Sequence, residues 1–242
     1  MRLMSWNVNG IRSALRKGAL RVVNDFDIVL LQEIRSSDLP LDLLSMDFNV
    51  YGFPAVRKGY SGVLTLSRVK PINVIRGIGV KDFDDEGRVI SIELPDFYVI
   101  NVYFPRAGDN LSRLSFKLAF NRSIEKFALD LRLRKPVVIC GDFNAVYARQ
   151  DSSFWNENHP GLTPLERQWL SEFIGKGFTD TFRLIHPNEV KYSWRSYRDK
   201  SKAMRIDYCL ASSELTNRVV DADILNNVEG SDHSPVLLVI NP

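Results

Sequence analysis

The sequence predicts an α/β fold in which two β-sheets pack face to face and helices cover their outer faces. Short apolar runs of strand length alternate with turn residues along most of the chain, whereas few segments have the longer periodicity of an amphipathic helix. Many strands with few helices fit best when the sheets pack together and the helices lie outside them. No long linker, charge block or low-complexity stretch interrupts the chain, so we expect residues 1–242 to form a single domain.

Nine segments have the composition of strands, because they are apolar, rich in β-branched or aromatic residues, and bounded by turn residues. These expected strands are Arg2–Trp6, Ile28–Gln32, Asn49–Phe53, Gly62–Ser67, Val89–Leu94, Tyr98–Tyr103, Val137–Cys140, Ile206–Leu210 and Val236–Ile240.

Three segments have a helical pattern. The first is expected from Ser13, a suitable N-cap, to about Asn24. The second runs from about Asn110 to Arg132, with Asp109 or Asn110 as its cap and an apolar stripe on one side. The third begins at Thr163-Pro164-Leu165-Glu166, which is a capping box with proline at the first helical position.

The bulk composition is that of an ordinary globular protein. The 242 residues are 45% hydrophobic and 25% charged, with a net charge of +3 that is compatible with a polyanionic partner. No apolar run approaches the ~18 residues of a membrane span. The first residues, Met1–Asn7, lack the apolar segment and small-residue cleavage site of a signal peptide.

The two cysteines, Cys140 and Cys209, both lie inside apolar strand-like runs. We expect them to be two buried thiols in preference to a disulfide or a metal pair, because zinc sites use more Cys or His residues at short spacing. Free thiols agree with a reducing intracellular compartment.

Polar side chains interrupt or follow five of the apolar runs. Asn7 and Glu33 each end one, Asp142-Phe143-Asn144 ends a third, Arg205-Ile206-Asp207 opens a fourth, and Ser231-Asp232-His233 precedes the last. An ionised carboxylate at such a position is costly unless a cation or a proton-transfer role compensates it. Each cluster alone is also compatible with a solvated strand end or a turn, but five together point to one site.

The metal that such a site would take follows from its donors. Asn7, Glu33 and Asp232 offer hard oxygen atoms, which suit magnesium or manganese better than zinc.

Seven blocks occur in a fixed order: SWNVNGIR, LLQEIR, GYSGV, NVYFP, GDFN, RIDY and GSDHSP. Together they resemble the exonuclease III-like AP endonucleases of the endonuclease/exonuclease/phosphatase superfamily, over nearly the whole chain from Trp6 to Pro235. The resemblance implies a four-layered α/β sandwich of two mainly antiparallel sheets flanked by helices.

The resemblance also implies roles at the metal and the phosphate. Asn7 and Glu33 match the metal site, with Asn9 nearby. Asp232 matches an acidic residue that either binds metal or organises the site.

The other matched residues are catalytic. Asp142 matches the group that activates or positions the attacking water, and Asn144 matches its partner. Tyr103 matches the tyrosine that contacts the phosphate, and Asp207 and His233 match the carboxylate–imidazole pair beside it.

DNA contacts are expected from two basic segments. In the family, the region that holds Arg12, Arg16 and Lys17 grips the phosphate backbone, which gives affinity without sequence reading. The family uses the turn that holds Arg57, Lys58, Gly59 and Tyr60 against the minor groove.

The chain departs from the family at positions that bear on substrate choice. Arg106 stands where asparagine is usual, and the segment Asp151–Gly161 differs from the usual asparagine-rich loop. Met204 takes the place of a tryptophan that lines the sugar pocket in relatives, whereas Trp194 keeps an aromatic ring there. Because methionine fills space less specifically than tryptophan, we expect a looser pocket with relaxed discrimination.

The implied activity is Mg²⁺-dependent hydrolysis of the phosphodiester 5′ to an abasic site, leaving a 3′-hydroxyl, with Mn²⁺ as a substitute ion. A 3′→5′ exonuclease or other-lesion activity can accompany it. The expected partner is double-stranded DNA with abasic or 3′-end lesions, and the protein is expected to be a cytoplasmic monomer without a membrane partner. The alternatives are a phospholipid or inositol-phosphate phosphodiesterase of the same superfamily, a DNA-binding protein without catalysis, and a nonspecific DNase.

Overall fold

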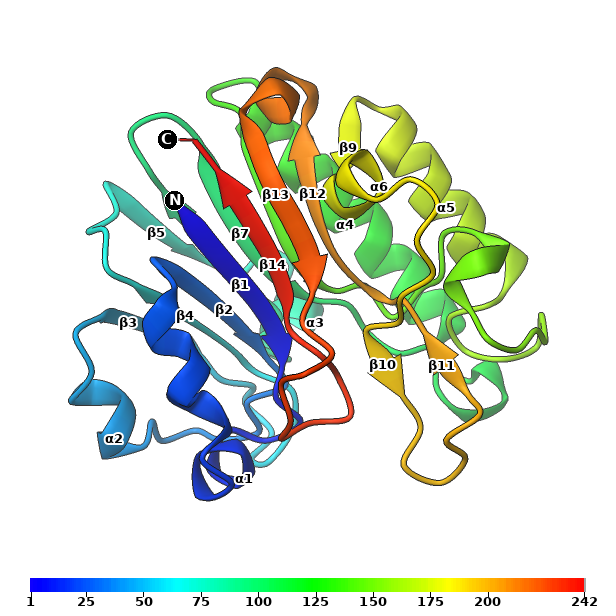
Figure 1. Cartoon of the computed structure of the whole chain (residues 1–242), viewed down its shortest axis with the longest axis horizontal. Helices are drawn as coiled ribbons and strands as arrows, with labels where there is room; N and C mark the ends of the chain where they lie inside the picture. Colours follow the sequence, from blue (N-terminus) through cyan, green and yellow to red (C-terminus); the bar gives the residue numbers. More distant parts are fainter. Residues whose placement is uncertain (242) are drawn as a thin grey trace.

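Two six-stranded sheets packed face to face dominate the structure, a computed structural model that describes residues 1–241 (Figure 1). In spatial order, sheet A consists of β13 (Val219–Ile224), β14 (Val236–Ile240), β1 (Arg2–Asn7), β2 (Ile28–Gln32), β4 (Val63–Ser67) and β3 (Asn49–Phe53). Sheet B consists of β5 (Asn73–Arg76), β6 (Val89–Glu93), β7 (Tyr98–Tyr103), β8 (Val137–Asp142), β12 (Asp207–Ser212) and β9 (Phe178–Asp180). A two-stranded ribbon, β10 (Trp194–Arg195) with β11 (Ala203–Met204), projects beyond one end of the sheets (Figure 1).

Three apolar cores separate four layers. The central core lies between the two sheets. A second core packs α4 (Leu114–Arg132) and α5 (Pro164–Gly175) on the outer face of sheet B. A third packs α1 (Ile11–Arg16) and the 3₁₀ helix η1 (Ala19–Asp25) on sheet A. The predicted four-layered α/β sandwich is therefore confirmed.

Short elements complete the described chain and lie in the connections between the strands. They are α2 (Leu41–Leu44), α3 (Lys81–Asp84), α6 (Thr181–Ile185), η2 (Asp109–Leu111), η3 (Arg149–Asp151) and η4 (Ser213–Arg218). Strand pairing is mainly antiparallel, as predicted, and the pairs β1·β2 and β7·β8 are parallel. Of the described residues, no helix is long and apolar enough to cross a membrane.

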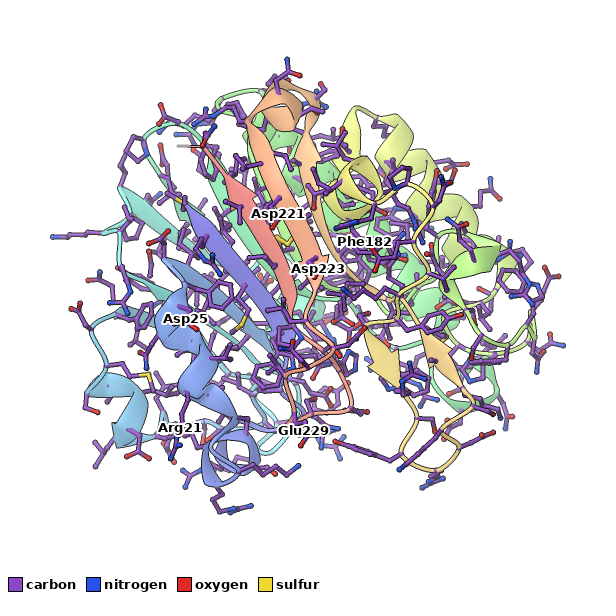
Figure 2. All side chains as sticks on the ribbon, viewed as in Figure 1. Arg21, Asp25, Phe182, Asp221, Asp223 and Glu229 are labelled. Carbon is purple, nitrogen blue, oxygen red and sulfur yellow. A yellow bond between two sulfur atoms is a disulfide. The ribbon has the colours of Figure 1, made fainter. Side chains whose placement is uncertain are left out.

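All nine predicted strands are present, within two residues of the expected bounds at either end. The sequence did not reveal β5, β9, β10, β11 or β13, which are short or polar. On β13 the side chains of Asp221 and Asp223 alternate with the buried Ala222 and Ile224 (Figure 2). Aspartate is unfavourable in strands, so this edge strand did not have a strand-like composition.

The predicted helices were correct in place but not always in their ends. The first begins at Ile11, after Gly10, and gives way at Gly18 (φ 68°) to a 3₁₀ helix, so Ser13 is not its cap. The second begins at Leu114, and neither Asp109 nor Asn110 caps it.

The capping box of the third helix is confirmed, because the Thr163 hydroxyl accepts from Glu166 N at 3.3 Å and the Glu166 carboxylate accepts from Thr163 N at 3.3 Å.

The expectation of two free thiols was wrong. Cys140 and Cys209 form a disulfide between β8 and β12, drawn as the yellow bond in Figure 2. The two residues are direct partners in the antiparallel register, with Cα atoms 4.1 Å apart, so their side chains meet on the same face of sheet B. A separation of 69 residues hid this pairing in the sequence, and the inference of a reducing compartment loses its support.

Gly141 permits the close parallel contact of β7 and β8. A Cβ atom at this position would lie 1.7 Å from the carbonyl oxygen of Val102 on β7. No side chain can therefore be added without separating the strands just before Asp142.

Replacement of Gly141 by alanine is expected to lower the free energy of unfolding by about 3 kcal/mol, because a packed backbone must move. Urea unfolding measures this. The matched control is Gly175→Ala at the exposed end of α5, where nothing lies within 4 Å of the added atom and a gain of about 0.5 kcal/mol is expected. Equal unfolding midpoints for Gly141→Ala and the wild type would contradict the argument.

Candidate active site

One row of side chains crosses the end of sheet B. Tyr103 on β7 pairs with Asp142 on β8, and Asp142 pairs with Asp207 on β12. Because the three residues are in register, their side chains lie on the same face of the sheet. Cys140 and Cys209, two residues back on the same strands, belong to the core between the sheets. The row is therefore the polar end of that core.

Sheet A supplies Asn7, the last residue of β1, and Glu33, the residue after β2. The Asn7 side-chain nitrogen donates to the Glu33 carboxylate at 2.9 Å and to the Asp142 carboxylate at 2.9 Å. Its oxygen accepts from the backbone N–H of Asn9 at 2.9 Å. Asn7 thus joins the carboxylates of the two sheets across the sandwich.

His233 lies against the Asp142–Asp207 row from the loop that enters β14. Its Nδ1 is 2.8 Å from the Asp207 carboxylate, and its Nε2 is 3.9 Å from that of Asp142. The Trp6 indole donates to the carbonyl oxygen of His233 at 2.8 Å, which fixes the loop on β1. The predicted pair of Asp207 and His233 is thus in place geometrically.

Ser193, which the sequence did not single out, completes this pair. Its hydroxyl donates to the Asp207 carboxylate at 2.7 Å and accepts from the backbone N–H groups of Ile206 and Asp207 at 3.0 Å each. Its carbonyl oxygen accepts from Ser234 N at 2.7 Å. Ser193 therefore links the start of β12 to the His233 loop, a link that no sequence motif marks.

Burial and charge shift the ionisable groups of the row. Burial raises the pKa of Asp142 to about 7, and the neighbouring Asp207 carboxylate adds to the rise. Burial alone would lower the pKa of His233, but the Asp207 and Asp142 carboxylates outweigh it and raise that pKa to about 10. Burial and the nearby Glu33 carboxylate raise the pKa of Tyr103, so its phenol stays a hydrogen-bond donor.

A buried lysine holds the turn that follows Asp142. Lys117 of α4 donates to the carbonyl oxygens of Phe143, at 3.1 Å, and Asn144, and pairs with Glu166 of α5 at 3.0 Å. Asn144 has a left-handed backbone (φ 49°), and its N–H donates to the Asp142 carboxylate at 2.8 Å. Lys117 was not predicted, because a lysine on an amphipathic helix is ordinarily a solvated side chain.

Asp232 has both carboxylate oxygens engaged. One accepts from the Asn9 side chain at 2.8 Å and the other from the Trp194 indole at 3.1 Å. Glu33 is held in the same way, by the Asn7 amide on one oxygen and by Arg35 at 2.9 Å on the other. Metal binding and organisation of the site therefore both stay predictions for Asp232.

A cavity of about 270 Å³ opens at this row. Ten residues that the sequence predicted for the site line this cavity: Asn9, Glu33, Tyr103, Arg106, Asp142, Asn144, Trp194, Met204, Asp232 and His233. The predicted DNA-contact residues Arg12 and Arg16 lie instead on the exposed side of α1, and the exposed Lys17 follows its last residue. Arg57 and Gly59 lie in the exposed turn before β4, with Tyr60 half-buried.

The segment Asp151–Gly161 contributes His159 and Pro160 to the cavity wall. His159 was not among the predicted site residues. Its Nδ1 lies 2.7 Å from the carbonyl oxygen of Pro160, and burial lowers its pKa. Trp155 of the same segment does not line the cavity. Its ring lies 5.1 Å from the Arg149 guanidinium and 4.7 Å from that of Arg167, and it packs against the cluster that holds Met204 and Ile206.

The donor set fits a hard divalent cation. Glu33 and Asp142 direct carboxylate oxygens at the same amide, and atoms of Asp142, Asp207 and His233 lie within 4.8 Å of one another. One oxygen of the buried Asp207 carboxylate has no hydrogen-bond partner among residues 1–241. Oxygen-rich groups of this kind suit magnesium or manganese.

Residues 4–233 match the model of the endonuclease/exonuclease/phosphatase family. The chain belongs to this family. An exodeoxyribonuclease of Bacillus subtilis is 40% identical to it over 251 residues, with 100% of both chains covered. The DNA repair nuclease APEX1 of Danio rerio is 36% identical, with 99% of this chain and 82% of the relative covered.

Solved structures of the family have the same fold. An AP endonuclease from Archaeoglobus fulgidus superposes with a TM-score of 0.87 at 28% identity, and 100% of each chain is covered. The 3′ phosphatase NExo from Neisseria, bound to a product DNA hairpin, gives a TM-score of 0.89 at 27% identity, again with 100% of each chain covered. Together these relatives place this family member among the exonuclease III-like AP endonucleases, as its sequence blocks predicted.

Because the pKa of Asp142 is raised, the folding stability of the metal-free protein is expected to depend on pH. Its folded value of about 7 lies above the ordinary value of 3.8, so the folded state holds the proton more tightly than the unfolded state. The resulting stability is present below about pH 4 and is lost as the pH rises to about 7. Asp142→Asn stays uncharged and avoids this loss.

We therefore expect the melting temperature of metal-free Asp142→Asn, relative to the wild type, to rise by a few degrees between pH 4 and pH 7 and then to level off. Thermal unfolding in a chelator across this range measures the difference. A difference that does not change with pH would contradict the assigned shift.

Proposed function

We propose that this chain is a metal-dependent DNA-repair nuclease that hydrolyses the phosphodiester 5′ to an abasic site and leaves a 3′-hydroxyl. The observation that carries the proposal is the row of Tyr103, Asp142 and Asp207 with His233, at the mouth of a cavity lined by Trp194. The named activities of the relatives, exodeoxyribonuclease and AP endonuclease, support it.

Each polar group has a role that suits hydrolysis of an anionic ester. Asp142 orients the attacking water and takes its proton, for which a pKa of about 7 is well matched. His233, held by Asp207, donates a hydrogen bond and positive charge to the phosphate. The Tyr103 hydroxyl donates a hydrogen bond to the phosphate and keeps its proton, and Asn144 holds Asp142 and the water in place.

Magnesium is the proposed ion, and manganese substitutes for it. Glu33 and Asn7 would hold it, while Asp232 organises Asn9 and Trp194 around the site. When bound, the ion neutralises charge on the phosphate and the leaving oxygen.

DNA is gripped outside the cavity by exposed cations. Arg12 and Arg16 on α1, with Lys17 just after it, contact one part of the phosphate backbone, and the turn Arg57–Tyr60 contacts the minor groove. The cavity receives the extruded sugar, and removal of groups from 3′ ends is a second activity of the same site. The flexible Met204 in the cavity wall favours this second activity, because it constrains the occupant less than a tryptophan would.

The family match over residues 4–233 supports one catalytic domain, which we propose acts as a monomer in the cytoplasm.

Product analysis on a duplex with one abasic site tests the function. We expect a nick on the 5′ side of the lesion with a 3′-hydroxyl, and no cut at that position in the intact duplex. Asp142→Asn should bind the same DNA and cleave it at least ~100-fold more slowly, because the water loses its base. A nick on the 3′ side, or hydrolysis of a phosphoinositide in place of DNA, would rule the proposal out.

Loss of a metal ligand should change the metal requirement. Glu33→Ala is expected to raise the magnesium concentration for half-maximal cleavage by about 10-fold or more. Glu172→Ala on the exposed side of α5 is the control and should leave the titration unchanged. Overlapping titration curves for Glu33→Ala and the wild type would remove Glu33 from the metal site.

A further inference from the structure

Arg88, the residue before β6, is a buried arginine that the catalytic roles above leave unused. Its side chain is 2% exposed, and its guanidinium group reaches three different partners. The Nη1 group donates to the carbonyl oxygen of Tyr103 at 3.0 Å, Nη2 to the Tyr60 hydroxyl at 3.1 Å, and Nε to Glu86 at 2.6 Å. A buried arginine needs a counter-ion, and Glu86 supplies it.

The contacts of Arg88 with Tyr103 go beyond charge compensation. The Arg88 carbonyl oxygen accepts from Tyr103 N at 2.9 Å, so both backbone polar groups of Tyr103 are bound to one residue. The Cζ atom of Arg88 also lies 4.8 Å from the centre of the Tyr103 ring. A planar cation over an aromatic face restrains the ring as well as the backbone.

The same group reaches the exposed turn Arg57–Tyr60. The Tyr60 hydroxyl accepts from both Arg88 and Arg113, the latter at 2.6 Å, and Arg113 pairs in turn with Glu86 at 2.6 Å. The Arg57 guanidinium lies 5.4 Å from the Tyr60 ring. A continuous polar network therefore joins a basic surface turn to the tyrosine in the catalytic row.

We propose that Arg88 is a positioning residue, which fixes Tyr103 at the reacting phosphate and couples it to the turn Arg57–Tyr60. The inference rests on the proposed roles of Tyr103 and of that turn. Arginine is required at this position because lysine, a single point charge, can keep the Glu86 pair but cannot bind Tyr103 and Tyr60 at the same time. Through the guanidinium, DNA bound at the turn Arg57–Tyr60 affects the position of Tyr103 in the catalytic row.

The test is a double-mutant cycle. The rate of cleavage of an abasic duplex is measured under single-turnover conditions, with magnesium present and the enzyme in saturating excess over the duplex. Arg88→Lys is expected to slow cleavage of bound DNA by about 10-fold to 100-fold and to change the dissociation constant by less than about 3-fold. In the background of Tyr103→Phe, the same substitution should cost less than about 3-fold, because both changes remove one function. Equal losses in both backgrounds would reduce Arg88 to a structural role and overturn the inference.

A matched control is Arg132→Lys at the far end of sheet B. Arg132 also binds a glutamate (Glu214) and a carbonyl oxygen, and its guanidinium lies 5.5 Å from the Phe178 ring. It is expected to leave the cleavage rate unchanged. A rate loss for Arg132→Lys as large as that for Arg88→Lys would also overturn the inference.

Tyr60→Phe provides a second route if Arg88→Lys does not fold. It removes one hydroxyl from a half-buried side chain and should slow cleavage of bound DNA by about 3-fold to 10-fold, with no such loss in the Tyr103→Phe background. An unchanged rate for Tyr60→Phe would break the coupling. Full activity of Tyr103→Phe itself would instead refute the proposed role of Tyr103, so the two failures are distinguishable.

Discussion

The register of three neighbouring strands determines where the chemistry of this protein can occur. Tyr103, Asp142 and Asp207 are cross-strand partners, so a shift of one residue in β7, β8 or β12 would turn one of them to the other face of the sheet. Several features hold this register. Gly141 lets β8 approach β7, the disulfide joins β8 to β12 one row behind the carboxylates, and Lys117 fixes the turn after Asp142.

The row has an electrostatic cost that the surrounding fold must compensate. Asp142 and Asp207 are both almost fully buried, and their mutual repulsion is relieved by His233 between them and by the Asn7 amide. The compensation is partial, because the pKa of Asp142 remains raised to about 7. A cation is therefore the natural partner of a site that the folded protein alone leaves with repelling carboxylates, and these carboxylates lower the stability of the metal-free protein.

Most of the sandwich, and the meeting of the proposed catalytic groups at one place, could be predicted from the sequence, because each depends on local pattern. Apolar runs marked the main strands, and polar residues at their ends marked Asn7, Glu33, Asp142 and Asp207. The disulfide, Ser193, Lys117 and Arg88 escaped prediction for a common physical reason. Their partners lie far along the chain or are backbone carbonyl oxygens, so neither spacing nor residue type revealed them.

The residues proposed to perform hydrolysis and those proposed to select the lesion are held in different ways. Tyr103, Asp142 and Asp207 sit on strands, where register and core packing fix them, and His233 lies in a loop that the Trp6 indole holds on β1. In contrast, His159 and Pro160 belong to an irregular segment. Met204 lies on a two-residue strand of the projecting ribbon, paired with Trp194. The buried Arg205, next to Met204, donates to Asp151 at 2.8 Å, so the segment and the ribbon are joined into one wall. The wall is nevertheless bonded to the row, because Trp194 donates to Asp232 and the preceding Ser193 donates to Asp207. A change in the ribbon therefore reaches the carboxylates as well as the opening through which the sugar would enter.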